Sequence, residues 1–277
     1  MQADYHVHSY HSDDSTTPIE EIVLKAKEIG LNEFALTDHV DYGIKKDYGE
    51  SDYTYLFGEP RVNVDYPVYF KELDDLQKKY PEISIKKGLE FGIQYHTIDK
   101  YNKLFNSYPF DFIILSIHQV DDLEFWTQEY QKDKTQQEYI EGYYNEMYKV
   151  VSNYTNYSVL GHMDLIVRYD KQGKYPFEKV KPIIEKILRK VIQDGKGIEI
   201  NTSSRQYGLD DLTPSRAILK LYKELGGTIL TIGSDSHKTE TLGTDLDYTK
   251  KELLKLGFET YCTFDCMKPI FHNLKED

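Results

Sequence analysis

Short apolar runs alternate with amphipathic helical segments along this whole chain, and that alternation restricts the possible fold more than any other feature. It predicts an α/β protein with a parallel sheet, because parallel strands are usually joined by helices. Seven such units without a glycine-rich phosphate loop favour a closed β/α barrel over an open sheet. The expected strands are 3–7, 34–37, 83–89, 110–117, 157–160, 197–200 and 228–232, and the expected helices are 18–29, 67–79, 97–106, 135–152, 177–193, 213–225 and 245–256.

The chain has the length of one barrel domain. Its 277 residues fit a single domain over 1–277, and no linker or low-complexity stretch divides them. No run approaches the roughly 18 apolar residues that a membrane-spanning helix needs, and the N-terminus lacks the features of a signal peptide. Two cysteines, Cys262 and Cys266, are too few for a disulfide scaffold and fit a reducing compartment. We therefore expect a cytoplasmic protein without a membrane partner, of undefined oligomeric state.

The charge of the chain limits its partners. A formal net charge of −13 argues against nucleic acid, because binding a polyanion draws on clustered Lys and Arg. A small phosphorylated substrate stays compatible, since two or three bound divalent cations would reverse the sign of the charge locally.

Three local patterns add detail. Residues 41–66 are polar and without periodicity, which indicates a long loop over a site. The chain has 25 tyrosines, many of them in 42–69 and 139–157, and we expect most to be half-buried at the surface. Thr17-Pro18-Ile19-Glu20 has the pattern of a capping box, which predicts Thr17 as the N-cap of the first helix. A strand-like run at 259–264 follows the last helix.

Polar clusters follow the expected strands, each where its strand ends. In a β/α barrel these carboxyl ends meet on one face, so residues far apart in sequence become neighbours. His6 and His8 are two residues apart and share one face of a strand, so both can reach one ion. Asp235 and His237 repeat that spacing after another strand. Glu90 ends a third strand, and a carboxylate can bridge two ions through its two oxygens.

The remaining candidate ligands are individually ambiguous. His39, His118 and His162 could each be a hydrogen-bonded core histidine, but their recurrence at strand ends favours a multinuclear metal site and hence hydrolysis. Asp14 lies in the loop after the first histidine pair, where it could also be a turn residue, and the adjacent Asp13 competes with it for the ligand position.

As a set, these motifs resemble the polymerase and histidinol phosphatase (PHP) superfamily. They occur in family order over residues 6 to 237. The resemblance implies a distorted seven-stranded β/α barrel, TIM-like in form, with three metal ions. By this resemblance the first ion takes His6, His8, Glu90 and Asp235, the second takes Glu90, His118 and His162, and the third takes Asp14, His39 and His237.

Within the superfamily, the size and downstream sequence resemble the histidinol-phosphate phosphatase family. That resemblance implies hydrolysis of L-histidinol phosphate to L-histidinol and phosphate, a step of histidine biosynthesis. Arg168 and Arg205 both follow strand ends, and guanidinium groups suit phosphate oxygens. Either could instead be a surface charge, but the resemblance favours phosphate contact. Arg61 in the long loop is a weaker third candidate.

Two to three divalent transition metals are expected as cofactors, and imidazole and carboxylate ligands suit zinc, iron or manganese. The nucleophile is expected to be a metal-bound hydroxide, and no side chain is singled out as general acid. The alternatives are a PHP phosphatase acting on phosphotyrosine or a nucleotide, a nuclease of the superfamily, which the negative charge disfavours, and a non-catalytic metal-stabilised binding module. Degeneration to such a module should have cost ligands, yet all the candidate positions carry them.

Overall fold

Seven parallel strands form the centre of the computed structural model, which describes residues 1–56 and 58–275. They pair in the order in which they occur along the chain. Val7 of the first strand bridges in parallel to Ser236 beyond the last, which nearly closes the sheet into a barrel. This confirms the predicted distorted (β/α)7 barrel. The strands are β1 (Ala3–Val7), β2 (Glu33–Leu36), β6 (Ser84–Gly92), β7 (Phe112–Ser116), β10 (Val159–Leu160), β11 (Gly197–Asn201) and β12 (Leu230–Gly233).

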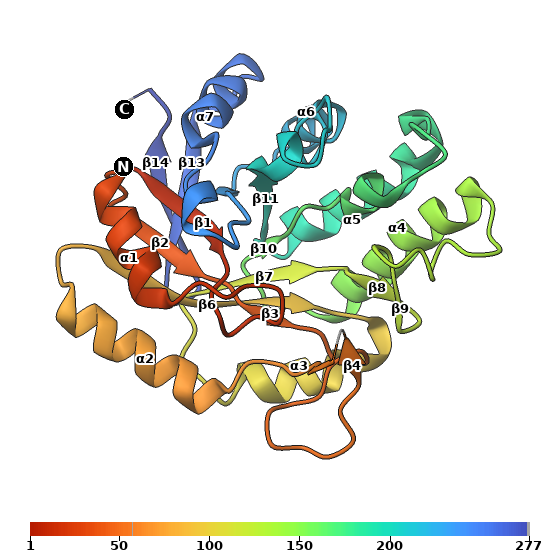
Figure 1. The fold of residues 1–277 in the computed structure, drawn as a ribbon. Coiled ribbons are helices and arrows are strands. Elements are labelled where there is room, and N and C mark those ends of the chain that lie inside the picture. Colours follow the sequence, from red (N-terminus) through yellow and green to blue (C-terminus); the bar gives the residue numbers. More distant parts are fainter. Residues whose placement is uncertain (57, 276–277) are drawn as a thin grey trace.

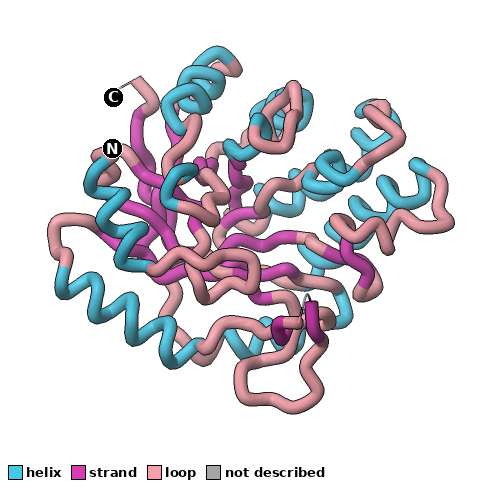
Figure 2. Tube along the Cα trace, in the orientation of Figure 1, coloured by secondary structure: helices cyan, strands magenta, loops and turns pink. Residues whose placement is uncertain are grey.

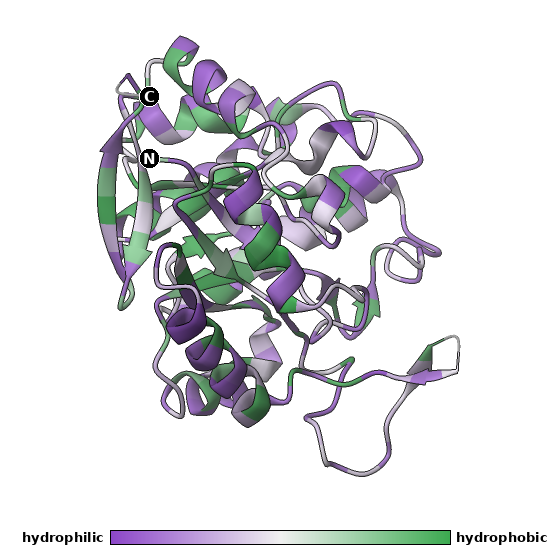
Figure 3. Cartoon of the chain, turned by 60° about the vertical axis from the view of Figure 1, so that its left-hand side comes forward, coloured by the Kyte–Doolittle hydropathy of each residue, from purple (hydrophilic) through white to green (hydrophobic). Residues whose placement is uncertain are grey.

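Helices surround these strands in the ribbon and tube views (Figures 1 and 2). Each lies within a few residues of the expected segment. They are α1 (Ile19–Glu28), α2 (Tyr66–Lys79), α3 (Ile98–Phe105), α4 (Gln136–Asn153), α5 (Phe177–Gln193), α6 (Arg216–Glu224) and α7 (Leu246–Lys255). Short 3-10 helices add η1 (Tyr95–Thr97), η2 (Leu165–Tyr169), η3 (Thr202–Arg205) and η4 (Thr239–Thr241). Figure 3 shows hydrophobic residues concentrated on the central strands, while the helices carry both kinds.

The amino-terminal end of the barrel is closed by a hairpin of β13 (Thr260–Asp265) and β14 (Lys268–Asn273). Phe264 packs with Phe112, the first residue of β7, and with Tyr5 of β1. The Phe264 amide also donates to the Tyr5 hydroxyl at 2.7 Å. The strand-like run at 259–264 is therefore confirmed, but the sequence did not reveal that it folds back antiparallel instead of joining the barrel. With this end plugged, the carboxyl end is left for a site.

The predicted capping box is wrong. Helix α1 begins at Ile19 with Pro18 as its N-cap, and no side chain caps it. The Thr17 hydroxyl instead donates to the His237 carbonyl at 3.1 Å, and Ser15 donates to the same oxygen at 2.9 Å. Residues 15–17 thus fasten the loop after β1 to the loop after β12, and that contact takes the hydroxyl away from the helix.

The expectation of half-buried tyrosines is also wrong for much of the chain. Nine of the largest fully buried side chains are tyrosines. Several reach backbone carbonyls: Tyr101 donates to Val40 at 2.7 Å, and Tyr69 donates to Gly88 at 2.9 Å. Because a buried hydroxyl needs such a partner, these tyrosines act as core residues that also tie helices α2 and α3 to the sheet.

The segment 41–66 is mostly irregular, as expected, but it also contains a small hairpin of β4 (Tyr55–Leu56) and β5 (Glu59–Pro60). It follows β3 (His39–Val40), which pairs with β6. A second small hairpin, β8 (Gln119–Val120) with β9 (Leu123–Glu124), follows β7. Within the described residues, no helix has the length and apolar character needed to cross a membrane.

Candidate metal centre

Glu90, at the carboxyl end of β6, lies at the centre of a cluster of imidazoles and carboxylates. Its side chain is fully buried. Oxygen Oε1 lies 3.0 Å from Nε2 of His118 and 2.7 Å from Nε2 of His162. Oxygen Oε2 lies 3.2 Å from Nε2 of His6 and 2.9 Å from Nδ1 of His39. The two oxygens thus face different histidines, which is the arrangement a bridging carboxylate needs.

The group predicted for the first ion has the spacing of a coordination shell. Nε2 of His6 and Nε2 of His8 lie 3.5 and 3.3 Å from Asp235 Oδ1. Nε2 of His8 lies 3.6 Å from Glu90 Oε2. Two ligands each about 2.0–2.1 Å from a tetrahedral ion are about 3.3 Å apart. These separations are long for hydrogen bonds but match the edges of such a tetrahedron.

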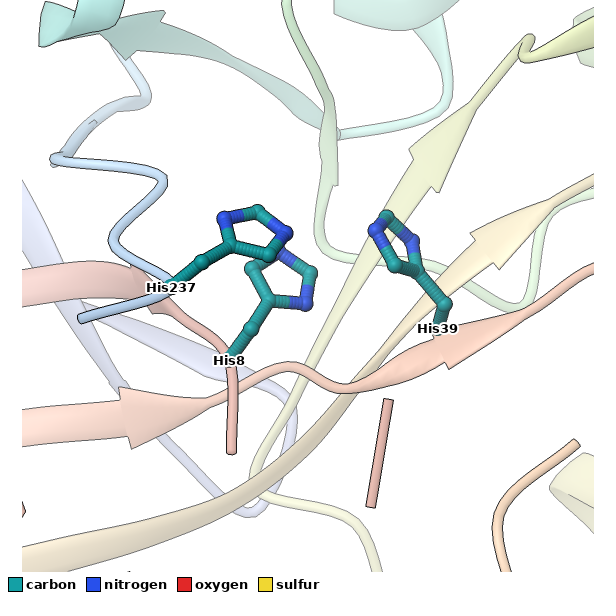
Figure 4. A group of neighbouring side chains, drawn as sticks. All are labelled: His8, His39 and His237. Atoms are coloured by element: carbon teal, nitrogen blue, oxygen red, sulfur yellow. The ribbon is translucent and has the colours of Figure 1, made fainter. Parts of the chain in front are cut away.

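The ligands predicted for the third ion lie beside the ligands predicted for the first ion. Asp14 Oδ2 is 3.4 Å from Nε2 of His39 and 3.1 Å from Nε2 of His237. Figure 4 shows the rings of His8, His39 and His237 gathered together, and each offers a nitrogen within 4.8 Å of the others. Asp13 instead binds Lys45, with its Oδ1 2.6 Å from Nζ. Of the two adjacent acids, Asp14 is therefore the one that faces the histidines.

Several polar atoms of the cluster are buried without a hydrogen-bond partner among the described residues. They are Nε2 of His6, His8 and His237, Nδ1 of His39 and His162, and Oε2 of Glu90. Leaving a buried polar atom unpaired costs about 1–3 kcal/mol. Most of these atoms point into the cluster, so one or more bound cations would satisfy them together. The donor set of imidazole nitrogens and carboxylate oxygens fits divalent transition metals.

Opposed charges shift the pKa values of His6 and Glu90 in this cluster. Burial alone would lower the pKa of His6, but Glu199, Glu90 and Asp235 outweigh it and raise the pKa well above its usual value. Burial would raise the pKa of Glu90, but the surrounding histidines outweigh it and lower the pKa well below its usual value. Without metal, a proton on His6 therefore offsets part of the carboxylate charge, whereas burial and the neighbouring His237 and His39 lower the pKa of His8. A metal ion would take the place of the His6 proton.

Two buried carboxylates behind the candidate ligands were missed from the sequence. Glu199 on β11 contacts Nδ1 of His6 through Oε1 and accepts from the His162 amide at 2.8 Å through Oε2. Asp41 lies 2.8 Å from Nδ1 of His118. Such partners fix the orientation and tautomer of a ligand histidine. A charged residue inside the apolar run Gly197–Asn201 was a signal for Glu199, whereas Asp41 had none.

A cavity of about 450 Å³ opens above the cluster. Arg168 lines it, paired with Asp235 at 3.2 Å and donating to Ser203 at 2.7 Å, while its Nε has no partner among the described residues. Arg61 also lines it, but both of its terminal nitrogens bind Glu124. The segment 41–66 contributes Asp41, Lys45, Leu56 and Arg61 to the wall, and the remaining lining includes Trp126, Leu165, Tyr169 and Tyr207.

Arg205 does not line this cavity. It lies at the end of η3, pairs with Asp245 at 3.4 Å, and places its guanidinium 4.0 Å from the centre of the Tyr248 ring. Its side chain is 58% exposed. Contact with a phosphate in the metal cavity would require Arg205 to leave Asp245. The other three histidines, His11, His96 and His272, contact Glu72, Asp122 and Thr263, respectively.

Comparison with known proteins defines the class to which this barrel and its cluster belong. Residues 4–203 match the PHP domain, so the chain belongs to that family. It is 32% identical to the histidinol-phosphatase of Lactococcus lactis, over 96% of this chain and 95% of the relative. It is 28% identical to a probable histidinol-phosphatase of Thermotoga maritima, over 98% of this chain and 99% of the relative.

A solved structure also resembles this chain closely. It is the crystal structure of histidinol phosphate phosphatase from Lactococcus lactis complexed with zinc, L-histidinol and phosphate. The TM-score is 0.83 at 30% identity, and the match covers 97% of this chain and 98% of that one.

Proposed function

We propose that this protein is a histidinol-phosphatase, which hydrolyses L-histidinol phosphate to L-histidinol and phosphate in histidine biosynthesis. The observation that carries the proposal is the convergence of nine ligand-type side chains, with Glu90 at their centre, beneath a cavity that Arg168 lines. The similarity to histidinol-phosphatases over nearly the whole chain supports the choice of substrate.

We propose two to three divalent metal ions, held by His6, His8, Asp14, His39, Glu90, His118, His162, Asp235 and His237. Zinc is favoured over iron and manganese because the similar Lactococcus lactis protein was crystallised with zinc. When bound, such ions lower the pKa of water and neutralise charge on phosphate oxygens.

The chain's own residues bind and orient the phosphate. Arg168 lines the cavity, is held there by Asp235 and Ser203, and is proposed to contact a phosphate oxygen. Arg205 is proposed as a second phosphate contact after it exchanges Asp245 for substrate. During hydrolysis water forms the new P–O bond, the ester P–O bond breaks, and the leaving alcohol oxygen takes up a proton.

We further propose that the substrate is a small phosphorylated molecule and not nucleic acid, given the net charge of −13. A cytoplasmic location is proposed because both cysteines are free thiols and histidine biosynthesis supplies the cell's own amino acid.

The test is phosphate release from a substrate panel, with elemental analysis of the same protein. We expect two to three transition-metal ions per chain. We also expect a higher kcat/KM for L-histidinol phosphate than for phosphotyrosine, a nucleoside monophosphate or a phosphodiester. His96→Gln, outside the cluster, should match wild type. A fully active metal-free protein, or a tenfold preference for another substrate, would contradict the proposal.

A further inference from the structure

A second cavity, of about 360 Å³, lies beside the metal cavity between α4, α5, η2 and the segment 208–215. Its volume is in the range of small-molecule sites. Much of the wall is apolar or aromatic. The apolar and aromatic lining residues include Ile140, Tyr175, Phe177, Val180, Leu212 and Ile218.

Among the polar side chains of this wall, Tyr144 and Asp164 are more than nine-tenths buried. Tyr144 is 3% exposed and lines the cavity. Asp164 is 7% exposed and accepts from the Ser215 amide at 2.8 Å through Oδ2, while Oδ1 has no partner within the described chain. Unpaired buried polar groups are uncommon and call for an explanation, such as a bound ligand.

The charge of the lining favours a cation. Asp164, Asp170, Asp210 and Asp211 line the cavity, and Lys174 is the only cationic side chain of its lining in the part of the chain that the structure describes. Arg216 offsets Asp211 through an ion pair at 2.5 Å. The remaining carboxyl groups outnumber Lys174. An anion would meet repulsion here, whereas an ammonium group would find acceptors.

We propose that this second cavity binds a small organic amine with an aromatic or branched apolar body. The body packs between α5 and α6, against Val180 and Ile218. The ammonium group donates to the Tyr144 hydroxyl oxygen and to the Asp164 carboxyl, which offers an acceptor in either protonation state.

Such a ligand would lie directly behind the metal cavity. Val167 of η2 lines the second cavity, and the next residue, Arg168, lines the first. Likewise, Gly208 lines the second cavity and the preceding residue, Tyr207, lines the first. The Arg168 guanidinium lies 4.3 Å from the centre of the Tyr207 ring. Because binding at two coupled sites is reciprocal, the amine is expected to change the affinity for phosphate.

Isothermal titration of the metal-loaded full chain with 2-phenylethylamine tests the proposal. Saturating inorganic phosphate keeps the metal cavity occupied during the titration. We expect one amine per chain, and at least tenfold weaker binding of the anion 3-phenylpropionate. Binding that phosphate abolishes by direct competition would place the amine in the metal cavity, and no saturable binding up to about 10 mM would also overturn the proposal.

Variants locate the binding site. Tyr144→Phe should weaken amine binding about tenfold, because it removes a hydrogen bond to a charged group. Tyr157→Phe is the matched control, since it removes a buried tyrosine hydroxyl that lies outside the cavity. Val180→Phe and Ile218→Phe fill the cavity and should each abolish binding, so one suffices if the other misfolds. Unchanged affinity in Tyr144→Phe and in a folded cavity-filling variant would overturn the proposal.

Discussion

Replacing Glu199 with glutamine tests whether the buried carboxylate behind His6 tunes the metal site. Glu199 uses one oxygen for His6 Nδ1 and the other for the His162 amide. Glutamine has nearly the same shape but only one carbonyl oxygen, so its NH₂ group must face one of these two donors. The variant therefore loses one charge-assisted hydrogen bond and the charge that orients the His6 ring.

The size of the effect follows from that single lost contact. A hydrogen bond to a charged group contributes about 1.5–3 kcal/mol, which corresponds to roughly ten- to hundredfold in a binding constant. Loss of an outer carboxylate behind a metal-binding histidine has effects of the same size, about 10–100-fold. We therefore expect Glu199→Gln to bind Zn²⁺ ten- to hundredfold more weakly than wild type.

The assay is titration of metal-free protein with Zn²⁺ in competition with a chromophoric chelator. Glu252→Gln is the matched control, because Glu252 also binds two donors, Arg216 and Lys255, but lies outside the metal cluster. Its Zn²⁺ affinity should equal that of wild type. Equal affinities for wild type and both variants would refute the argument that Glu199 supports His6.

Three further predictions concern the same cavity. Glu90→Gln should lose metal and activity together, so retained metal with a normal rate would refute the bridging role. Arg205→Ala should lower kcat/KM for L-histidinol phosphate roughly ten- to hundredfold with metal retained, and Arg205→Lys should recover part; wild-type turnover in Arg205→Ala would show a surface charge. Burial lowers the pKa of His118, but Glu90 and Asp41 raise it to about 9 from 6.5. Stability from the protonated ring is therefore complete below pH 6.5 and lost as pH rises through 9, so the Tm of metal-free protein should fall over that window, and a flat profile would contradict the pairing.

Strand positions were readable from the sequence because each apolar run ends in a polar cluster. The barrel geometry then placed residues as distant as His6 and His237 on one rim, and the structure brings all nine candidate ligands together there. The sequence did not show which side chains at these strand ends point into the metal cavity. Arg168 and Arg205 both follow strand ends, yet only Arg168 faces the metal cavity, because Arg205 stacks on Tyr248 instead.

The carboxylates behind the candidate ligand histidines could not be predicted from the sequence for a different reason. Asp41 supports His118 across 77 positions of sequence, and no periodicity connects them, because the contact depends on how the loop after β3 folds over β7. The hairpin of β13 and β14, which closes the amino-terminal end of the barrel, was also not predicted from the sequence. Lys268–Asn273 contains a proline and exposed polar residues, which weakens its strand pattern, although it pairs in full register with β13.

The single tryptophan of this chain lies on the wall of the metal cavity. Trp126 is 44% exposed and follows β9. Light that excites tryptophan but not tyrosine therefore reports on one place only, despite the 25 tyrosines. Substrate entry can be followed by intrinsic emission in the unmodified protein. The rate of filling can thus be measured separately from the rate of phosphate release in a stopped-flow experiment without any label.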